Sequence, residues 1–203
     1  MRVLELFSGT HSFGKVCEER GWEVVSLDID GRATITQDIL EWDYHTHGPF
    51  DVIWASPPCD HYSVMNNSNP KKTENIKELL EHSNSLVKRA LEIIEHFQPR
   101  YWFIENPQTG TLKSQEFMAK LPYYDLDYCR YGGWLRKRTR LWTNLTTFEP
   151  RVCGKGSACE RIRDGKHPKW GSMNLPGMNR LDLRHAIPPR LMNEIAEMIF
   201  WNK

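Results

Sequence analysis

Three short apolar runs in this sequence each stop at a turn built on glycine or proline, and polar side chains follow at once. The runs lie at residues 2–7 (RVLELF), 50–55 (FDVIWA) and 101–104 (YWFI), with lengths typical of buried strands. Proline forbids continued pairing inside a sheet, so two of these strands have a defined end. The three turns are Ser8-Gly9-Thr10, Ser56-Pro57-Pro58-Cys59 and Glu105-Asn106-Pro107.

Helical patterns separate these strands. Residues 12–20 are predicted to form a helix that ends at Gly21, and a further strand is predicted at 23–27. Residues 73–97 predict one long helix or two short ones, and residues 189–201 predict a final amphipathic helix. Alternating strands and helices build a mostly parallel sheet with flanking helices, in which ligands bind beyond the carboxyl ends of the strands. We therefore expect an α/β fold with its functional site at that edge.

The composition narrows the class of protein. The length of 203 residues suits one domain with a small appendage, and we expect a monomer. Its 27 basic and 26 acidic side chains nearly cancel, so contact with nucleic acid has to rest on local patches. No stretch approaches the ~20 apolar residues of a membrane span, and no signal-peptide pattern opens the chain, so we expect a cytoplasmic protein. Five unevenly spaced cysteines predict reduced thiols, with catalysis or metal binding for any special one.

The glycine turn after the first strand suits a nucleoside cofactor. Its backbone can approach a ligand closely, and a carboxylate at the end of the next strand, Asp28 or Asp30, would hold ribose hydroxyls. A glycine turn is also common in α/β proteins for structural reasons alone, and the GxGxxG pattern of dinucleotide sites is absent from the sequence. The turn by itself leaves both interpretations open.

Cys59 stands on a turn made rigid by two prolines, close to the expected cofactor. Covalent catalysis by cysteine requires a thiol in such a place, whereas most single cysteines are buried small apolar residues. Glu105 and Asn106, at the end of a neighbouring strand, would supply an acid and an amide nearby. Glu105 could equally be an exposed acid or a capping residue.

In combination, these motifs resemble the cytosine-5 DNA methyltransferase family, in a short form of the kind found in phages and viruses. LFSGTHSFG resembles the family's first motif, SPPCDHYS its Pro-Cys motif, ENP its Glu-Asn-Val motif and RKRTRLW its Arg-x-Arg motif. RHAIPPRLM resembles the closing motif that packs against the cofactor site. The order and spacing agree over essentially the whole length, and Pro-Cys followed by Glu-Asn is the specific part. The resemblance implies a Rossmann-like S-adenosylmethionine-dependent methyltransferase fold.

The resemblance also implies the cofactor and its neighbours. S-adenosylmethionine is the expected cofactor, with Asp28 or Asp30 on the ribose and Asp38 near the adenine. The residues expected at the cofactor are Phe7, Ser8, Gly9, Thr10, Phe13, Gly14, Asp28, Ile29, Asp30, Asp38, Ile39, Ser56 and Pro57. The residues expected to contact the substrate base are Pro58, Asn106, Pro107 and Arg136.

The family mechanism implied here is covalent catalysis on a cytosine of double-stranded DNA. The Cys59 thiolate would add to carbon 6 while Glu105 donates a proton or hydrogen bond to ring nitrogen 3, which makes carbon 5 nucleophilic. Arg138 or Arg140 would steady the cytosine carbonyl or a nearby phosphate. The target base has to leave the duplex to enter such a pocket, so base flipping is expected. Restriction-modification is one biological setting for this activity, and protection from restriction or evasion of host sensing are others.

Several features depart from the family pattern. Asp60 stands where the family commonly has Gln and Pro107 where it has Val, so the pocket around the base is expected to differ. The stretch between the arginine motif and the closing motif is far shorter than a normal target-recognition region. We therefore expect a catalytic α/β domain at 1–148, a reduced recognition insert at 149–180 and a C-terminal segment at 181–203 that packs back on the catalytic domain.

The insert also carries candidate metal ligands. Cys153, Cys159 and His167, with Cys129 upstream, could bind zinc through thiolate and imidazole groups. Their spacing is not the paired CxxC of a zinc module, and ordinary thiols in a basic loop are the alternative. The residues of the insert that could contact phosphates are Lys155, Arg161, Arg163, Lys166, Lys169 and Trp170.

Three other functions stay open at this point. One is a related cytosine-modifying transferase that uses a modified S-adenosylmethionine or an RNA substrate, and another is a non-catalytic DNA-binding homologue. The third, a thiol hydrolase with His61 as the base for Cys59, is disfavoured because residues two apart on a tight turn rarely face each other.

Overall fold

The computed structural model describes residues 1–63, 75–133, 135–154, 159, 161–162, 166–168 and 180–201. The strands are β1 (Arg2–Leu6), β2 (Glu23–Asp28), β3 (Ile35–Thr36), β4 (Val52–Ala55), β5 (Tyr101–Pro107), β6 (Tyr123–Asp127) and β7 (Arg138–Thr143). The helices are α1 (Ser12–Glu18), α2 (Ile76–Phe97), α3 (Arg180–His185) and α4 (Pro189–Trp201). Two short 3-10 turns bear on the site, η2 (Asp60–Tyr62) and η7 (Tyr128–Tyr131).

The strands form one seven-stranded sheet in the order β3-β2-β1-β4-β5-β7-β6. All neighbours from β3 to β5 pair in parallel, and β7 pairs antiparallel with both β5 and β6. The predicted mostly parallel sheet is therefore confirmed. Because the first five strands run in parallel, their carboxyl ends meet at one edge of the sheet.

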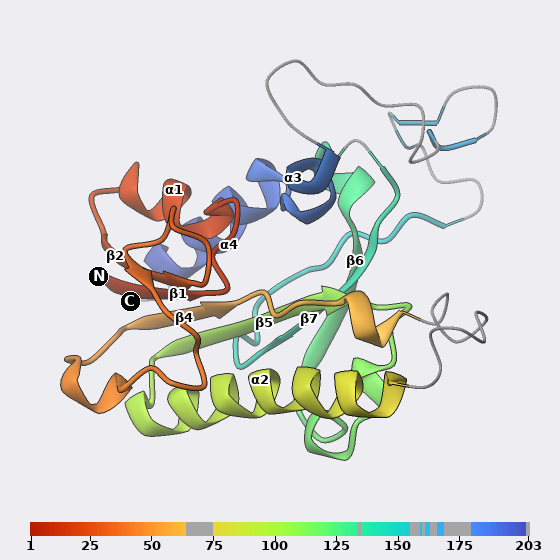
Figure 1. Cartoon of the computed structure of the whole chain (residues 1–203). Coiled ribbons are helices and arrows are strands. Elements are labelled where there is room, and N and C mark those ends of the chain that lie inside the picture. The colour runs from red at the N-terminus through yellow and green to blue at the C-terminus, as the bar shows by residue number, and fades with distance from the viewer. Residues whose placement is uncertain are drawn as a thin grey trace.

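Helices cover both faces of this sheet (Figure 1). Alternation along β1 sends Val3 into a core shared with α1 and α4, and sends Leu4 and Leu6 into a core shared with α2. The C-terminal helix α4 packs on α1, and the backbone N–H of Ile187 donates to Ser12 Oγ at 3.2 Å. Among the helices that the structure describes, none combines the length and the apolar character of a membrane-spanning segment.

Two predicted elements differ from the structure. We expected a turn at Glu105-Asn106-Pro107, but β5 continues through these residues because β7 pairs with them, Asn106 opposite Arg140 and Pro107 opposite Thr139. Pro107 is tolerated because β4 ends at Ala55, opposite Ile104, so β4 does not pair with β5 at Pro107. The segment expected from residue 73 forms a single helix, α2, from Ile76, and residues 73–74 lie outside the described part of the chain.

Candidate active site

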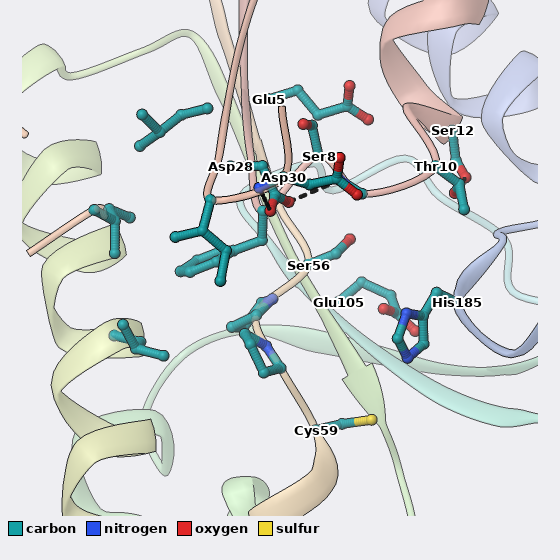
Figure 2. Close-up of a pocket in the computed structure, with 18 of the residues that line it drawn as sticks. Glu5, Ser8, Thr10, Ser12, Asp28, Asp30, Ser56, Cys59, Glu105 and His185 are labelled. Atoms are coloured by element: carbon teal, nitrogen blue, oxygen red, sulfur yellow. Dashed lines mark hydrogen bonds between the residues drawn. The ribbon is translucent and has the colours of Figure 1, made fainter. Parts of the chain in front are cut away.

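A cavity of about 620 Å³ lies at the carboxyl edge of the parallel strands. The glycine turn after β1, the acids after β2, the Pro-Pro-Cys turn after β4 and the end of β5 all line it. Asp182 and His185 of α3 line it as well. In Figure 2, Glu105 and His185 lie beside each other, Cys59 lies below them, and the acids that follow β2 lie above them. The three turns predicted to converge therefore border one cavity that has two chemically different ends.

The glycine turn has an unusual backbone. Phe7, Gly9 and His11 have φ values of 56°, 45° and 55°, in the left-handed region that only glycine adopts without cost. Left-handed non-glycine residues cost of order 1–3 kcal/mol each, and they concentrate at functional sites. Ion contacts hold His11 there, since its Nδ1 lies 2.6 Å from the buried Glu5 carboxylate. The hydrogen bond to Glu5 raises the pKa of His11, although partial burial lowers it.

The two acids after β2 have different neighbours. Asp28 accepts the backbone N–H of Gly9 at 2.8 Å and that of Asp30 at 2.9 Å, so its carboxylate joins the strand end to the glycine turn. Asp30 is held by the Arg32 guanidinium at 2.6 and 2.9 Å, and this contact lowers the pKa of Asp30. Asp28 is thus the acid that is built into the turn, and Asp30 belongs to an exposed ion pair.

Apolar side chains line the same end of the cavity. Ile29 follows Asp28 and is 77% exposed, which is unusual for a large apolar residue. Ile39 is buried in the cavity wall beside Asp38, whose carboxylate accepts the N–H of Leu40 at 2.9 Å. An exposed isoleucine beside strand-end carboxylates suits a ligand with both an apolar ring and hydroxyl groups.

The turn that carries Cys59 is fixed on both sides. Asn106 is fully buried in β5 and donates from Nδ2 to the carbonyl oxygen of Pro57 at 3.0 Å. After the cysteine, His61 Nδ1 lies 2.8 Å from Ser83 Oγ, and the Tyr62 hydroxyl donates to Asn84 of α2 at 2.9 Å. The half-buried Cys59 therefore has a defined position at the cavity. His61 is engaged with α2, which weakens the thiol hydrolase alternative further.

Glu105 is the buried acid at the Cys59 end. Its side chain is 8% exposed, and Oε1 accepts the Tyr128 hydroxyl at 2.7 Å, while Lys137 Nζ lies 3.6 Å from the same oxygen. Burial and then the charge of Glu105 raise the pKa of Tyr128 well above its ordinary value, so the phenol stays protonated and donates. Lys137 also lies over the Tyr128 ring, 5.0 Å from its centre. These three side chains form a packed acid, hydroxyl and ammonium group.

The arginines of the RKRTRLW motif lie away from this group. Arg140 makes a bidentate contact with Asp125 at 2.7 and 2.8 Å and stacks on Tyr123, and Asp125 raises its pKa. Arg138 is 53% exposed, with its Nε 4.0 Å from Asp127. Arg138 and Arg140, two apart on β7, lie on the side of Asp127 and Asp125 of β6, whereas Lys137, which directly precedes β7, lines the cavity.

Most of the predicted site residues line the cavity, and some do not. Phe13 is fully buried against Trp54, and Gly14 is buried beneath the His11 ring, so neither reaches the cavity. Arg136, Arg138 and Arg140 are also absent from its described lining. The predicted residues that line it are Phe7, Ser8, Gly9, Thr10, Asp28, Ile29, Asp30, Asp38, Ile39, Ser56, Pro57, Pro58, Cys59, Glu105, Asn106 and Pro107.

The predicted metal ligands come together elsewhere. The ligand atoms of Cys129, Cys153, Cys159 and His167 all lie within 4.8 Å of one another. Of the basic residues of the insert, Arg161 donates to the carbonyl oxygen of Gly132 at 2.8 Å, and Lys166 is exposed. The remaining predicted phosphate contacts, Lys155, Arg163, Lys169 and Trp170, lie outside the described residues.

Several cavity residues were not predicted from the sequence. Lys137 stands inside the RKRTRLW motif, directly before β7, but the motif pointed to the arginines on either side of it. Tyr128 carries no sequence pattern of its own, because η7 brings it to Glu105 from a separate segment. His82 from α2 and Asp182 and His185 from α3 line the cavity through tertiary packing alone.

Sequence comparison relates the chain to a viral protein. No family model matches the chain. The protein named probable DNA (cytosine-5)-methyltransferase of Frog virus 3 (isolate Goorha) is 38% identical over 217 residues, which cover 98% of this chain and 100% of the viral protein.

Solved structures match the fold. A protein described as a DNA modification methyltransferase encoded within an E. coli prophage has a TM-score of 0.50 and 16% identity, covering 70% of this chain and 46% of its own. The Entamoeba histolytica methyltransferase EhMeth has a TM-score of 0.50 and 15% identity, covering 75% of this chain and 55% of its own. The chain thus spans about half the length of these two structures. The predicted Rossmann-like methyltransferase fold is confirmed.

Proposed function

The chain belongs to the DNA (cytosine-5)-methyltransferase family, and we propose that it transfers a methyl group from S-adenosylmethionine to carbon 5 of a cytosine flipped out of double-stranded DNA. The observation that carries this proposal is that Cys59 and Glu105 line the same cavity as the strand-end acids. A thiol and an acid at one end, with nucleoside-binding groups at the other, suit a methyl transfer to a pyrimidine ring.

The residues at the acid end fit the cofactor. A cavity of about 620 Å³ falls in the range of small-molecule sites. The fixed Asp28 carboxylate suits ribose hydroxyls, and the exposed Ile29 suits one face of the adenine ring. The backbone of the glycine turn borders the region between them and Cys59. When bound, S-adenosylmethionine supplies an electrophilic methyl group.

Cys59 is proposed as the nucleophile. Its thiolate adds to carbon 6 of cytosine, a bond forms between sulfur and carbon, and the double bond between carbons 5 and 6 opens. Once carbon 5 carries the methyl group, a base removes the carbon 5 proton and the sulfur leaves, which restores the ring. The hydrogen bond from Asn106 to Pro57 supports this role, because it holds the turn against movement during both steps.

Glu105 is proposed to act on ring nitrogen 3 through a proton or hydrogen bond. Tyr128 is a positioning residue for Glu105, since its hydroxyl donates a hydrogen bond to that carboxylate. We assign the cytosine carbonyl oxygen to Lys137, the cation of the cavity lining that lies beside Glu105. The exposed Arg138 is better suited to a DNA phosphate outside the cavity.

The proposed function also bears on the oligomeric state, the division of the chain and the compartment. The protein acts as a monomer with a catalytic part at 1–148, a small insert at 149–180 and a C-terminal segment at 181–203. The contact between α4 and α1 supports the role of that last segment. A reactive thiol works best in a reducing compartment, so the cytoplasm suits this enzyme.

The direct test is transfer of radiolabel from S-adenosylmethionine to mixed-sequence duplex DNA, with nucleoside mass spectrometry of the product. We expect label in 5-methylcytosine with the wild-type chain and none with Cys59→Ala. Label in RNA alone, or a transferred group other than methyl, would replace this proposal with a related transferase. Cofactor binding without transfer to any nucleic acid would make the chain a non-catalytic homologue.

The covalent step has a separate test. Duplex DNA with 5-fluorocytosine at the modified position traps such enzymes, because fluorine cannot leave as a proton does. We expect a denaturation-resistant complex with wild-type protein and none with Cys59→Ala. An active enzyme that forms no adduct would rule out the cysteine mechanism.

A further inference from the structure

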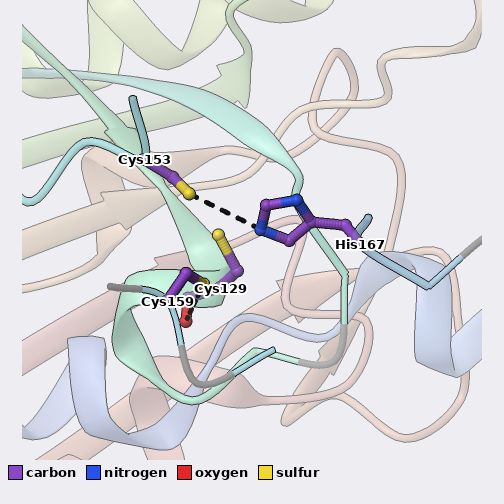
Figure 3. Close-up of side chains that lie close together, drawn as sticks. All are labelled: Cys129, Cys153, Cys159 and His167. Atoms are coloured by element: carbon purple, nitrogen blue, oxygen red, sulfur yellow. Dashed lines mark hydrogen bonds between the residues drawn. The ribbon is translucent and has the colours of Figure 1, made fainter. Parts of the chain in front are cut away.

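A group of soft ligand atoms lies outside the cavity. We propose that Cys129, Cys153, Cys159 and His167 bind one structural zinc ion (Figure 3). Cys129 belongs to η7, and the other three come from the segment that follows β7. The ion would therefore tie that segment to the body of the sheet.

The geometry matches a tetrahedral site. With Zn–S near 2.3 Å and Zn–N near 2.0–2.1 Å, ligand atoms of such a site lie about 3.5–3.8 Å apart. Cys153 Sγ and His167 Nε2 are 3.5 Å apart, the length of one edge of that tetrahedron. The other pairs fall within 4.8 Å, a distance that small side-chain rotations reduce to the required value. All five cysteines lie in the described part of the chain, and none is in a disulfide there.

Packing around the group gives an independent reason for a metal. The buried core at this place consists of the three cysteines, with Ile162 packed against them. Leu145 and Phe148, just after β7, pack in the main core, but between residues 149 and 168 the large apolar residues that the structure describes are Ile162 and Val152, and Val152 is 56% exposed. So little apolar area does not compensate the entropy of ordering these described residues, which belong to no helix and to no strand of the sheet. A metal bound by groups far apart in sequence supplies that free energy directly.

The ligand set selects the metal and its role. Thiolates and imidazole favour zinc over magnesium or calcium, which prefer oxygen. Four protein ligands fill a tetrahedral shell and leave no position for a substrate, so the ion is structural and not catalytic.

Neighbouring hydrogen bonds give the ligands a fixed second layer. The buried Asp127 carboxylate accepts the N–H of Cys153 at 2.8 Å and the Nε of Arg136 at 3.3 Å. Arg136 also donates to the carbonyl oxygen of Cys153. Partners of this kind orient metal ligands, and Arg136, which makes these contacts, does not line the cavity.

The site is also connected to the proposed catalytic acid. Cys129 directly follows Tyr128, and Tyr128 donates to Glu105. A metal that fixes Cys129 therefore fixes the turn that holds the partner of Glu105. Loss of the ion should lower methyl transfer while Cys59 keeps its own support from Asn106 and α2.

Metal analysis of the purified full-length chain, grown with added zinc, tests the proposal. We expect about one equivalent of zinc in the wild type, and less than about a tenth in Cys159→Ser. Cys17→Ala is the matched control, because Cys17 is buried outside the group, and it should keep its zinc. His167→Cys should also keep it, since four thiolates form an equally good zinc site. These readouts are independent of methyl transfer, so the proposed function and the zinc site can fail separately.

Cobalt replacement provides the second measurement. Wild-type protein loaded with cobalt should show visible bands of a tetrahedral ion and thiolate charge-transfer absorption, whether or not Cys159→Ser folds. Less than about a tenth of an equivalent of zinc in the wild type would overturn the proposal. So would zinc that survives both Cys159→Ser and His167→Ala, or a cobalt spectrum without thiolate charge transfer.

Discussion

Cys59 and the group formed by Cys129, Cys153 and Cys159 place the same side chain in two different environments of one small fold. Cys59 is half-buried at an open cavity, on a turn braced by hydrogen bonds from β5 and α2. The other three are buried together beside an imidazole, in a region with little apolar packing. A braced thiol at a cavity can react without cost to the fold, whereas clustered thiols can stabilise a fold but have no room to react.

Cys59→Ala tests the proposed role of Cys59 and should have the largest effect. Methyl transfer should fall by about 10⁴-fold or more, since removal of a covalent nucleophile disables the whole catalytic group. Zinc content should not change, and the free energy of unfolding should change by less than about 0.5 kcal/mol. Initial rates and urea unfolding measure the two effects. A Cys59→Ala protein that transfers methyl at a wild-type rate would show that Cys59 is not the nucleophile.

Glu105→Gln should have the next largest effect. The amide cannot deliver the proton that the carboxyl group supplies, so we expect a loss of roughly 10²–10⁴-fold in kcat. Affinity for S-adenosylmethionine should be retained, because Glu105 lies at the Cys59 end of the cavity (Figure 2). The control is Glu81→Gln, an exposed acid of α2. Equal rates for the two variants would remove Glu105 from the mechanism.

Lys137→Ala and Arg140→Ala compare two cations of the RKRTRLW motif, one at the cavity and one in an ion pair with β6. Lys137 lines the cavity, so its loss should reduce kcat by about 10–100-fold, the value of one charge-assisted hydrogen bond. Arg140 braces β6 through Asp125, so its loss should cost about 1–2 kcal/mol of stability, with a smaller effect on kcat. Steady-state kinetics and urea unfolding of both variants separate the two roles. A large loss of kcat in Arg140→Ala with little change in Lys137→Ala would indicate that Arg140, and not Lys137, contacts the cytosine base.

Part of the fold and of the candidate site could be predicted from the sequence. Short apolar runs with proline and glycine ends predicted the parallel strands and their common edge, because those signals act locally. Cys59 and Glu105 were predicted to meet because an apolar run ends just before each of them at the same edge of the sheet, and both line the cavity there. Arg140 was placed at the base from its motif, but Asp125 on a neighbouring strand binds its guanidinium, and such a pair depends on strand order.

Other parts of the site depend on contacts that no local pattern encodes. Tyr128 reaches Glu105 because η7 folds back beside β5. Phe13 was expected at the cofactor, but the first turn of α1 directs it into the core against Trp54. The predicted zinc ligands have no paired spacing, and tertiary folding brings them together.

Tyr128→Phe tests the connection between the two regions. It removes one buried hydrogen bond to Glu105 and leaves the ring in place, so we expect roughly a tenfold loss in kcat and about 1 kcal/mol of stability. The loss should fall on kcat and leave the affinity for S-adenosylmethionine unchanged, because Tyr128 contacts Glu105 and does not line the cavity. Zinc content should stay at the wild-type level. A loss of cofactor affinity with an unchanged kcat would mean that Tyr128 does not act through Glu105.

The smallest effect concerns the glycine turn, which lines the cavity beside Asp28. Its hydrogen bond with Glu5 raises the folded-state pKa of His11 above 6.5, so the charged form stabilises the folded protein. That stability is fully present below about pH 6.5 and is lost as the pH rises through the raised pKa.

His11→Asn removes the titrating ring but keeps a residue that tolerates positive φ. Urea unfolding at about pH 6 and pH 8.5 should therefore show a smaller pH-dependent loss of stability in the variant than in the wild type. If both proteins lose the same stability over that interval, the contact between His11 and Glu5 does not hold the turn. The cost of its left-handed backbone would then have to be met by the bond from Gly9 to Asp28.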